Sequence, residues 1–229
     1  MKTAEITSPQ RYVEDRATGQ IRRIYDRGAW WYDFREWLPE RLAFRRWRRG
    51  LWGLVPDGAV LEVGVGTGKN FPHYGEGHQV TAVDFSPKML RRAQTLAERD
   101  GLPVTLMLMD AQALDFEDES FDSVVSTFVF CSVPDPVLGL REVRRVLKPG
   151  GRAYLLEHVL SQKRALRWLM RRFNGVARAL NGANIDRDTV GNVEGAGFAV
   201  IEVRDLWSDI VKLIIAERST EGSLRRVSA

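Results

Sequence analysis

The fold of this chain is decided by the stretch AVLEVGVGTGKN, residues 59–70. Its first five residues are mostly apolar, as is typical of a buried strand, and glycines 64, 66 and 68 follow at once. Glycine lets the backbone turn tightly and lets a ligand come closer than a Cβ would allow. The stretch therefore predicts a strand, a ligand-binding loop and a following helix. The loop alone does not identify the ligand, because dinucleotide sites use a similar device.

Downstream of this stretch, short apolar strands alternate with amphipathic helices. Ser86 and Pro87 are residue types of an N-cap and a first helical position, so a helix is expected from there to about Asp100. Such alternation predicts a parallel sheet that helices cover on both faces, which is an α/β fold. We expect strands at 59–63, 80–83, 104–109, 123–128, 152–157, 198–204 and 211–217, a second helix at 136–147 and a turn at 148–151.

Composition narrows the class of protein. With 229 residues, 44% of them hydrophobic, the chain can build one domain with a substantial core. The single cysteine, Cys131, excludes an intramolecular disulfide and any zinc site that needs two thiolates, and three histidines argue against a multi-histidine metal centre. No apolar run approaches 18 residues and the N-terminus lacks a signal-peptide core, so we expect a cytoplasmic protein, soluble or peripherally bound to a membrane.

Two acids follow predicted strands and bear on the ligand. A dinucleotide fingerprint needs glycine at the sixth position counted from Gly64, where this chain has Lys69. A carboxylate at Asp84 can accept both hydrogen bonds of a ribose diol. Asp110 can accept the exocyclic amine of adenine, while the backbone N–H of Ala111 serves a ring nitrogen. The alternative for both acids is capping of a helix N-terminus.

Four runs of the sequence resemble the class I S-adenosylmethionine-dependent methyltransferases. They are VLEVGVGTGKN (60–70), VTAVDFSPKML (80–90), MDAQALDFEDESFDSVVS (109–126) and LREVRRVLKPGGRAYLLEH (140–158). Over about residues 21–217 the chain is similar to the group of ubiquinone and menaquinone C-methyltransferases and bacterial phosphatidylethanolamine N-methyltransferases. Residues 125–151 also resemble membrane-associated thiol methyltransferases of animals. The resemblance implies a Rossmann-like, seven-stranded, mostly parallel sheet with the last strand antiparallel, an N-terminal helical lid, and S-adenosylmethionine across the carboxyl ends of the strands.

The resemblance also implies roles for individual residues, with S-adenosylhomocysteine as the product. Lys69-Asn70 departs from the small or acidic residue that the family often has after the glycines, so Lys69 is interpreted as a surface charge. The cofactor-binding residues implied are Gly64, Gly66 and Gly68 along the methionine part, Glu62 below the loop, Asp84 on the ribose, Phe85 on the adenine face, Asp110 and Ala111 on the adenine edge, and Thr127 toward the methionine or the acceptor.

Methyl transfer from a sulfonium is an in-line displacement, so alignment is the main task and no nucleophilic side chain is needed. In agreement, we expect Cys131 to be a small buried residue. Tyr25 and Tyr32 lie seven residues apart in a segment that resembles the tyrosine lid of phospholipid and quinone methyltransferases; alternatively they anchor a helix on the sheet. His158 is a candidate to take a proton or orient a head group, or else a structural histidine. Tyr25, Tyr32 and His158 are therefore the catalytic candidates.

Two segments combine arginine with large apolar residues. Residues 41–52 and 163–178 interleave basic side chains with tryptophan, leucine and phenylalanine, which fits helices in an anionic bilayer interface. The alternatives are nucleic acid, which is disfavoured by the tryptophans, and packing of the tryptophans on the sheet with solvated arginines. The net charge of +4 is explained by an arginine-rich composition and does not by itself indicate an anionic partner.

The chain is thus expected to comprise a polar N-terminal arm (1–20), a helical lid and membrane-facing segment (21–55), a methyltransferase domain (56–218) and a flexible tail (219–229). The function expected is methylation of the amine of phosphatidylethanolamine by S-adenosylmethionine, at the inner face of a membrane. C-methylation of a lipid quinone, S-methylation of small thiols, and a non-catalytic lipid- or cofactor-binding protein are the alternatives. The acids and glycines of the predicted site argue against the last. The sequence leaves open the acceptor, the number of methyl groups added and the oligomeric state.

Overall fold

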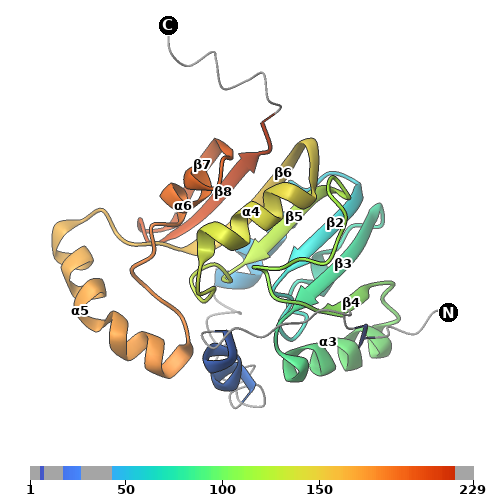
Figure 1. Cartoon of the computed structure of the whole chain (residues 1–229), viewed down its shortest axis with the longest axis horizontal. Coiled ribbons are helices and arrows are strands. Elements are labelled where there is room, and N and C mark those ends of the chain that lie inside the picture. Colours follow the sequence, from blue (N-terminus) through green and yellow to red (C-terminus); the bar gives the residue numbers. More distant parts are fainter. Residues whose placement is uncertain (1–5, 8–17, 27–42, 220–229) are drawn as a thin grey trace, which may run out of the picture.

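A central sheet with helices on both faces organises the chain (Figure 1). The computed structural model describes residues 6–7, 18–26 and 43–219. The strands are β1 (Ile6–Thr7), β2 (Gly58–Val63), β3 (His78–Asp84), β4 (Thr105–Leu108), β5 (Phe121–Thr127), β6 (Leu147–His158), β7 (Ala199–Trp207) and β8 (Val211–Glu217). The helices are α2 (Arg45–Trp52), α3 (Pro87–Asp100), α4 (Pro136–Val146), α5 (Arg164–Asn181) and α6 (Thr189–Gly195), with a helix over 18–26 and a 3₁₀ turn, η2 (Phe71–His73).

The strand order is β1-β4-β3-β2-β5-β6-β8-β7. Strands β2 to β6 pair in parallel, and β8 runs antiparallel to both β6 and β7, so the predicted seven-stranded sheet with an antiparallel last strand is confirmed. One difference is the two-residue strand β1, which adds an eighth strand on the open side of β4 by pairing Ile6 with Leu106. The segment 1–20, expected as a polar arm, thus supplies strand β1 and the first residues of the helix over 18–26.

Local signals place several elements correctly. Helix α3 begins at Pro87 after Ser86, whose side chain accepts a hydrogen bond from the Met89 N–H at 3.2 Å, and ends at Asp100. The predicted turn at 148–151 lies within the bounds of β6, but these residues do not pair with β5. Pairing passes from Phe121 and Leu147 to Ser123 and Arg152, and Gly150 between them has a φ of +76°, so the chain leaves the regular ladder where the turn was expected.

The core has two halves, one on each face of the sheet. Leu61 of β2 and Val124 of β5 face α4, while their neighbours Val60 and Val125 pack on the side of α2 and α3. Alternate side chains of a strand point to opposite faces, so both faces of these central strands are apolar and buried. In Figure 1, α4 covers one face of the sheet near β5, and α3 lies beyond β4.

Helix α2 is a core element, which corrects part of the sequence interpretation. Residues 41–52 were expected to face a membrane, but Leu51 and Trp52 are buried against the sheet and Arg48 is only 5% exposed. The spacing explains the difference, because Arg48 lies three and four residues before this apolar pair and therefore shares their face. Arg45 and Arg49 remain exposed on the other side of the helix, and residues 41–42 lie outside the described part.

Helix α4 offers a matched test of this core. Leu140 is fully buried against the sheet, whereas Leu138 on the same helix is 42% exposed. We expect Leu140→Ala to lower the free energy of unfolding by about 2–5 kcal/mol because it leaves a cavity, and Leu138→Ala to change it by less than about 0.5 kcal/mol. Urea denaturation measures both, and equal effects of the two variants would contradict the assignment of α4 to the core.

Candidate active site

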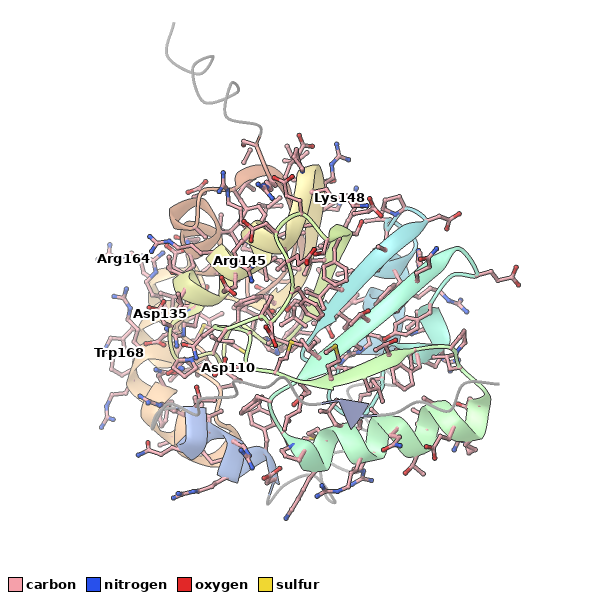
Figure 2. All side chains as sticks on the ribbon, turned by 45° about the vertical axis from the view of Figure 1, so that its right-hand side comes forward. Asp110, Asp135, Arg145, Lys148, Arg164 and Trp168 are labelled. Carbon is pink, nitrogen blue, oxygen red and sulfur yellow. The ribbon has the colours of Figure 1, made fainter. Side chains whose placement is uncertain are left out.

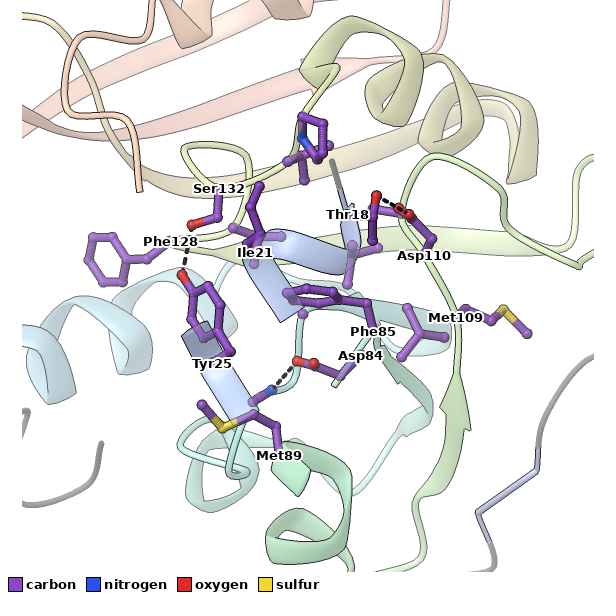
Figure 3. Close-up of a pocket in the computed structure, with 18 of the residues that line it drawn as sticks. Thr18, Ile21, Tyr25, Asp84, Phe85, Met89, Met109, Asp110, Phe128 and Ser132 are labelled. Atoms are coloured by element: carbon purple, nitrogen blue, oxygen red, sulfur yellow. Dashed lines mark hydrogen bonds between the residues drawn. The ribbon is translucent and has the colours of Figure 1, made fainter. Parts of the chain in front are cut away.

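A pocket opens at the carboxyl ends of the central strands. Strand β2 lies there between its neighbours β3 and β5. The pocket encloses about 740 Å³ of empty space, part of it open to solvent. Ligands of open α/β sheets bind in such a crevice. Figure 3 shows Phe85 and Tyr25 facing it, with Asp84 and Asp110 at its rim.

The glycine loop forms one wall of the pocket. Gly64 and Gly66 line it with φ of +74° and +57°, a backbone region that side chains disfavour. A Cβ on Gly64 would lie 2.3 Å from a methyl group of Val129, whereas a Cβ on Gly66 would meet no protein atom within 4 Å. Gly68 does not line the pocket and packs instead against the ring of Phe71. The loop therefore offers a ligand open backbone at Gly66.

Asp84 joins the glycine loop to the start of α3. Its Oδ2 accepts a hydrogen bond from the Gly66 N–H at 2.8 Å, and its Oδ1 accepts one from the Ser86 N–H at 2.9 Å. Burial raises the pKa of the carboxyl to about 6, although backbone hydrogen bonds from Ser86, Gly66 and Phe85 oppose this rise. Because Ser86 caps α3, Asp84 does not serve as its cap. A carboxylate has about four acceptor positions, so Asp84 can still accept from the expected ribose diol.

Asp110 follows β4 on the other side of the pocket from Thr127. Its Oδ1 accepts a hydrogen bond from the Gln112 N–H at 2.9 Å, and its Oδ2 accepts one from the Thr18 hydroxyl at 2.8 Å. Ala111 also lines the pocket, as the predicted adenine contact requires. No α-helix in the described part of the chain starts at Asp110, so the capping alternative does not account for it.

The helix over residues 18–26 covers the pocket. Thr18, Ile21 and Tyr25 line it, and the Tyr25 hydroxyl lies 2.7 Å from the Ser132 hydroxyl. The Tyr25 ring meets Phe85 edge to face, with centroids 5.7 Å apart. The predicted lid position of Tyr25 agrees with this placement (Figure 3). Tyr32, its predicted partner, lies outside the described residues.

A buried polar network lies behind the pocket, below the glycine loop. Asn70 Nδ2 donates to Glu62 Oε1 at 2.7 Å, and the Tyr74 hydroxyl donates to the other oxygen of Glu62. Arg48 Nη1 donates to Asn70 Oδ1 at 3.1 Å and to Thr127 Oγ1 at 2.6 Å. Burial raises the pKa of Glu62, which lies below the loop as expected. Sequence reasoning missed Arg48 and Asn70, although the helical spacing of Arg48 with Leu51 was an available signal.

His158 lies beside the pocket and is not one of the residues that line it. Its ring centroid is 4.8 Å from that of Phe128, which does line the pocket, and 6.5 Å from that of Phe44. Burial lowers the pKa of His158 and so favours the neutral ring. The ring of Phe128 lies between His158 and the pocket. The role of His158 in taking a proton stays a prediction.

The neighbouring Glu157 and Cys131 are both buried. Glu157 Oε1 accepts hydrogen bonds from the Val129 N–H at 3.0 Å and the Phe130 N–H at 3.2 Å, and burial raises the pKa of the carboxyl to about 7. It thereby holds the loop that carries Phe128. Cys131 is buried, as expected, and burial raises the pKa of its thiol to about 12, which argues against a nucleophile.

Comparison with known proteins agrees with this geometry. A family model described as a methyltransferase domain matches residues 61–155, the region from β2 through most of β6. This chain carries a methyltransferase domain. A solved S-adenosylmethionine-dependent methyltransferase from Methanosarcina mazei matches with a TM-score of 0.59 and 25% identity, over 73% of this chain and 95% of that one. A putative methyltransferase from Bacillus halodurans, at 19% identity and a TM-score of 0.64 over 76% and 97% of the two chains, shows the same fold.

The relatives of this chain are named for different methyl acceptors. A phosphatidylethanolamine N-methyltransferase of Cereibacter sphaeroides is 46% identical over 108 residues, 46% of this chain and 53% of that one. A thiol S-methyltransferase of Rattus norvegicus is 33% identical over 68% and 66% of the two chains. A demethylmenaquinone methyltransferase of Renibacterium salmoninarum is 35% identical over 62% and 60%. The chain thus spans between 53% and 66% of these relatives' lengths.

S-adenosylmethionine is the cofactor implied by the family match and the solved neighbours, and the pocket residues fit it. Asp84 offers acceptors for a diol, and Asp110 with Ala111 offers an acceptor and a backbone edge for adenine. The backbone of Gly66 leaves open the space that a Cβ would fill. When bound, this cofactor supplies a methyl group on a positively charged sulfur.

We expect binding of S-adenosylhomocysteine to depend on ionised Asp84. Asp84→Ala should weaken binding at pH 7.5 by about 1–3 kcal/mol, because charge-assisted hydrogen bonds are lost. Since the pKa of Asp84 is about 6, the wild-type Kd should rise as the pH falls from 7.5 to 5, and this rise should be smaller in the variant.

Isothermal calorimetry measures these constants, with Asp115→Ala as the control, because Asp115 is an exposed acid that does not line the pocket. Unchanged affinity in a folded Asp84→Ala protein would remove Asp84 from the ribose site.

Proposed function

We propose that this protein transfers methyl groups from S-adenosylmethionine to the amine of phosphatidylethanolamine at a membrane surface. The observation that carries the acceptor is the exposed apolar and basic face of α5, close to a pocket that fits the cofactor. The similarity to a phosphatidylethanolamine N-methyltransferase supports the same acceptor.

The chain's own residues supply binding, orientation and exclusion of water. Asp84 and Asp110 hold the cofactor at its ribose and adenine, so its reactive end is directed toward Thr127 and Phe128. The helix over 18–26 covers this end, and the Tyr25 hydroxyl is positioned by Ser132. Orientation of this kind contributes roughly 7–11 kcal/mol to barrier reduction in favourable systems. No nucleophilic side chain is required.

The exposed face of α5 has the composition of an interfacial helix. Trp168 is 66% exposed, Leu169 45%, Phe173 50% and Val176 56%, although all four are apolar. Figure 2 shows Arg164 and Trp168 together on the outer side of this helix. Large apolar side chains next to arginines suit insertion among lipid head groups, with the cations on phosphates. The exposed arginines of the helix are Arg164, Arg171, Arg172 and Arg178.

Helix α5 ends next to the lid. Gly182 follows its last residue, and a Cβ there would lie 3.1 Å from the Tyr25 ring and 3.5 Å from a methyl group of Ile21. A membrane in contact with α5 would therefore lie near the covered pocket. Of the helices in the part that the structure describes, none is both long and apolar enough to cross a membrane. We infer peripheral association with the inner face of the membrane, through α5 rather than through the buried face of α2.

S-methylation of a small thiol is the second candidate. The rat thiol S-methyltransferase matches 68% of this chain, against 46% for the phosphatidylethanolamine N-methyltransferase, although at lower identity. The exposed face of α5 has no evident role with a soluble thiol, so we place the phospholipid first.

An acceptor panel tests the proposal. The protein should transfer label from S-adenosylmethionine to phosphatidylethanolamine in vesicles, and more slowly, or not at all, to demethylated quinols and small thiols. Mass spectrometry of the labelled product identifies the acceptor and the number of methyl groups. Preferential labelling of a thiol or a quinol would reject the phospholipid, and no labelling despite cofactor binding would reject catalysis on these three classes.

The membrane surface is tested with variants of α5. Arg164, Arg171 and Arg172 changed together to glutamine should reduce binding to anionic vesicles, because each arginine near such a surface contributes about 1 kcal/mol of attraction. Trp168→Gln with Phe173→Gln should remove the part of binding that high salt does not weaken, since apolar insertion is not screened by salt.

Vesicle sedimentation measures binding, and calorimetry checks that affinity for S-adenosylhomocysteine is kept. The matched control changes Lys88, Arg91 and Arg141 to glutamine, because these exposed side chains carry the same charge on α3 and α4. If the control lost as much vesicle binding as the α5 variant, the loss would be due to net charge and not to α5.

A further inference from the structure

Strand β7 is the last strand on its side of the described sheet. Three of its apolar side chains, those of Ile201, Val203 and Trp207, are between 39% and 58% exposed. On the neighbouring strand β8 most apolar residues are buried. The edge of a last strand presents backbone donors and acceptors that can pair with another strand, and exposed apolar side chains along it favour such pairing.

The middle of β7 is a regular strand between two bulges. Its pairing with β8 shifts between Val200 and Glu202 and again between Asp205 and Trp207, so the residues from Glu202 to Asp205 are regular. Bulges and charges protect many natural edges from other chains. Here, however, the charges have opposite signs: Glu202 and Arg204 lie on one face of the strand, are accessible to solvent and form an ion pair. Two copies of β7 can exchange this pair between them.

Twofold symmetry restricts how β7 can pair with a copy of itself. In an antiparallel ladder, residues that lie opposite each other either both make the ladder's hydrogen bonds or both do not, and this property alternates along a strand. A twofold axis must therefore place one residue opposite its own copy. Glu202, Arg204 or Asp205 in that position would face a like charge. Val203 in that position places Glu202 of each copy opposite Arg204 of the other.

We propose that two copies of this chain associate through antiparallel pairing of their β7 edges, with Val203 opposite its own copy at the twofold axis. Two ion pairs between Glu202 and Arg204 then cross the interface. Because the paired strands run in opposite directions, Trp207 at the end of one strand lies near Ala199 and Ile201 at the start of the other. The exposed apolar side chains of β7 are thereby covered. This inference goes beyond the proposed function and does not depend on the methyl acceptor.

The pocket takes no part in this contact. Strands β8 and β6 separate β7 from β5, whose last residue, Thr127, lines the pocket. An axis that reverses the direction of β7 reverses the whole sheet, so the two pockets open on opposite edges of the joined sheet. A flat membrane can therefore face the pocket of one copy at a time. Each copy keeps its own cofactor site, and its affinity for S-adenosylhomocysteine should be the same in the monomer and in the dimer.

Reversal of single charges tests the pairing. Sedimentation equilibrium of the full chain over about 1–200 µM should show wild type passing from a monomer of 26.0 kDa to a dimer as the concentration rises. Glu202→Arg places arginine opposite arginine twice, and Arg204→Glu places glutamate opposite glutamate twice. Each variant alone should therefore dimerise at least about 10-fold more weakly than wild type.

A mixture of the two variants tests the register. When Glu202→Arg and Arg204→Glu proteins are mixed in equal amounts, every arginine at the interface meets a glutamate, so association should return. A double variant that carries both changes should associate for the same reason. The matched control is Glu117→Arg, which reverses an exposed acid away from β7 and should leave the dimer unchanged. Thermal denaturation and calorimetry with S-adenosylhomocysteine check that each variant is folded.

A wild type that stays monomeric at every concentration would overturn the proposal. So would a dimer that neither reversal weakens, because the contact would then lie on another face, such as that of α5. Folded variants that remain monomeric in the mixture would overturn the pairing of Glu202 with Arg204. None of these results bears on the labelling of acceptors, so failure of this proposal and failure of the proposed function are distinguishable.

Discussion

The Asp84 carboxylate is the group on which the geometry of the site depends. It ends β3 and accepts hydrogen bonds from the loop after β2 and from the turn that begins α3. These backbone donors keep Gly66 open toward the pocket. Burial opposes the charge that makes these bonds strong, and the raised pKa of Asp84 reflects that cost. The burial and hydrogen bonding of Asp84 thus have two results: the glycine loop is held in place, and the pKa of the carboxyl is raised to about 6.

The remaining parts of the site are attached to this frame by long-range polar contacts. Thr18 binds Asp110 across 92 positions of the chain, Tyr25 binds Ser132 across 107, and Arg48 binds Thr127 across 79. In each pair the first residue precedes the region matched by the methyltransferase family. The N-terminal segments thereby contribute to the pocket itself, both by covering it and by supporting its far end. Proteins that share the domain can differ in acceptor through such additions.

Sequence patterns were sufficient where a structure depends on neighbouring residues. Ser86 and Pro87 define the start of α3, and alternation of strands and helices defines the sheet, because caps and periodicity are local properties. They failed where partners are distant. Arg48 was assigned to a membrane surface because its neighbours are basic, although it is buried on the same side of α2 as Trp52. Its contact with Thr127 leaves no trace in local composition, and neither does the position of His158 behind Phe128.

The burial of Cys131 has a practical consequence. It is the one cysteine of the chain, and its thiol is inaccessible and almost entirely protonated at neutral pH. Maleimides and other thiol reagents react with exposed thiolates. A cysteine introduced on the outer side of α5 or on the helix over 18–26 would accordingly be the sole labelling position in the folded protein. Spectroscopic reporters can be attached there directly, without first replacing the native residue.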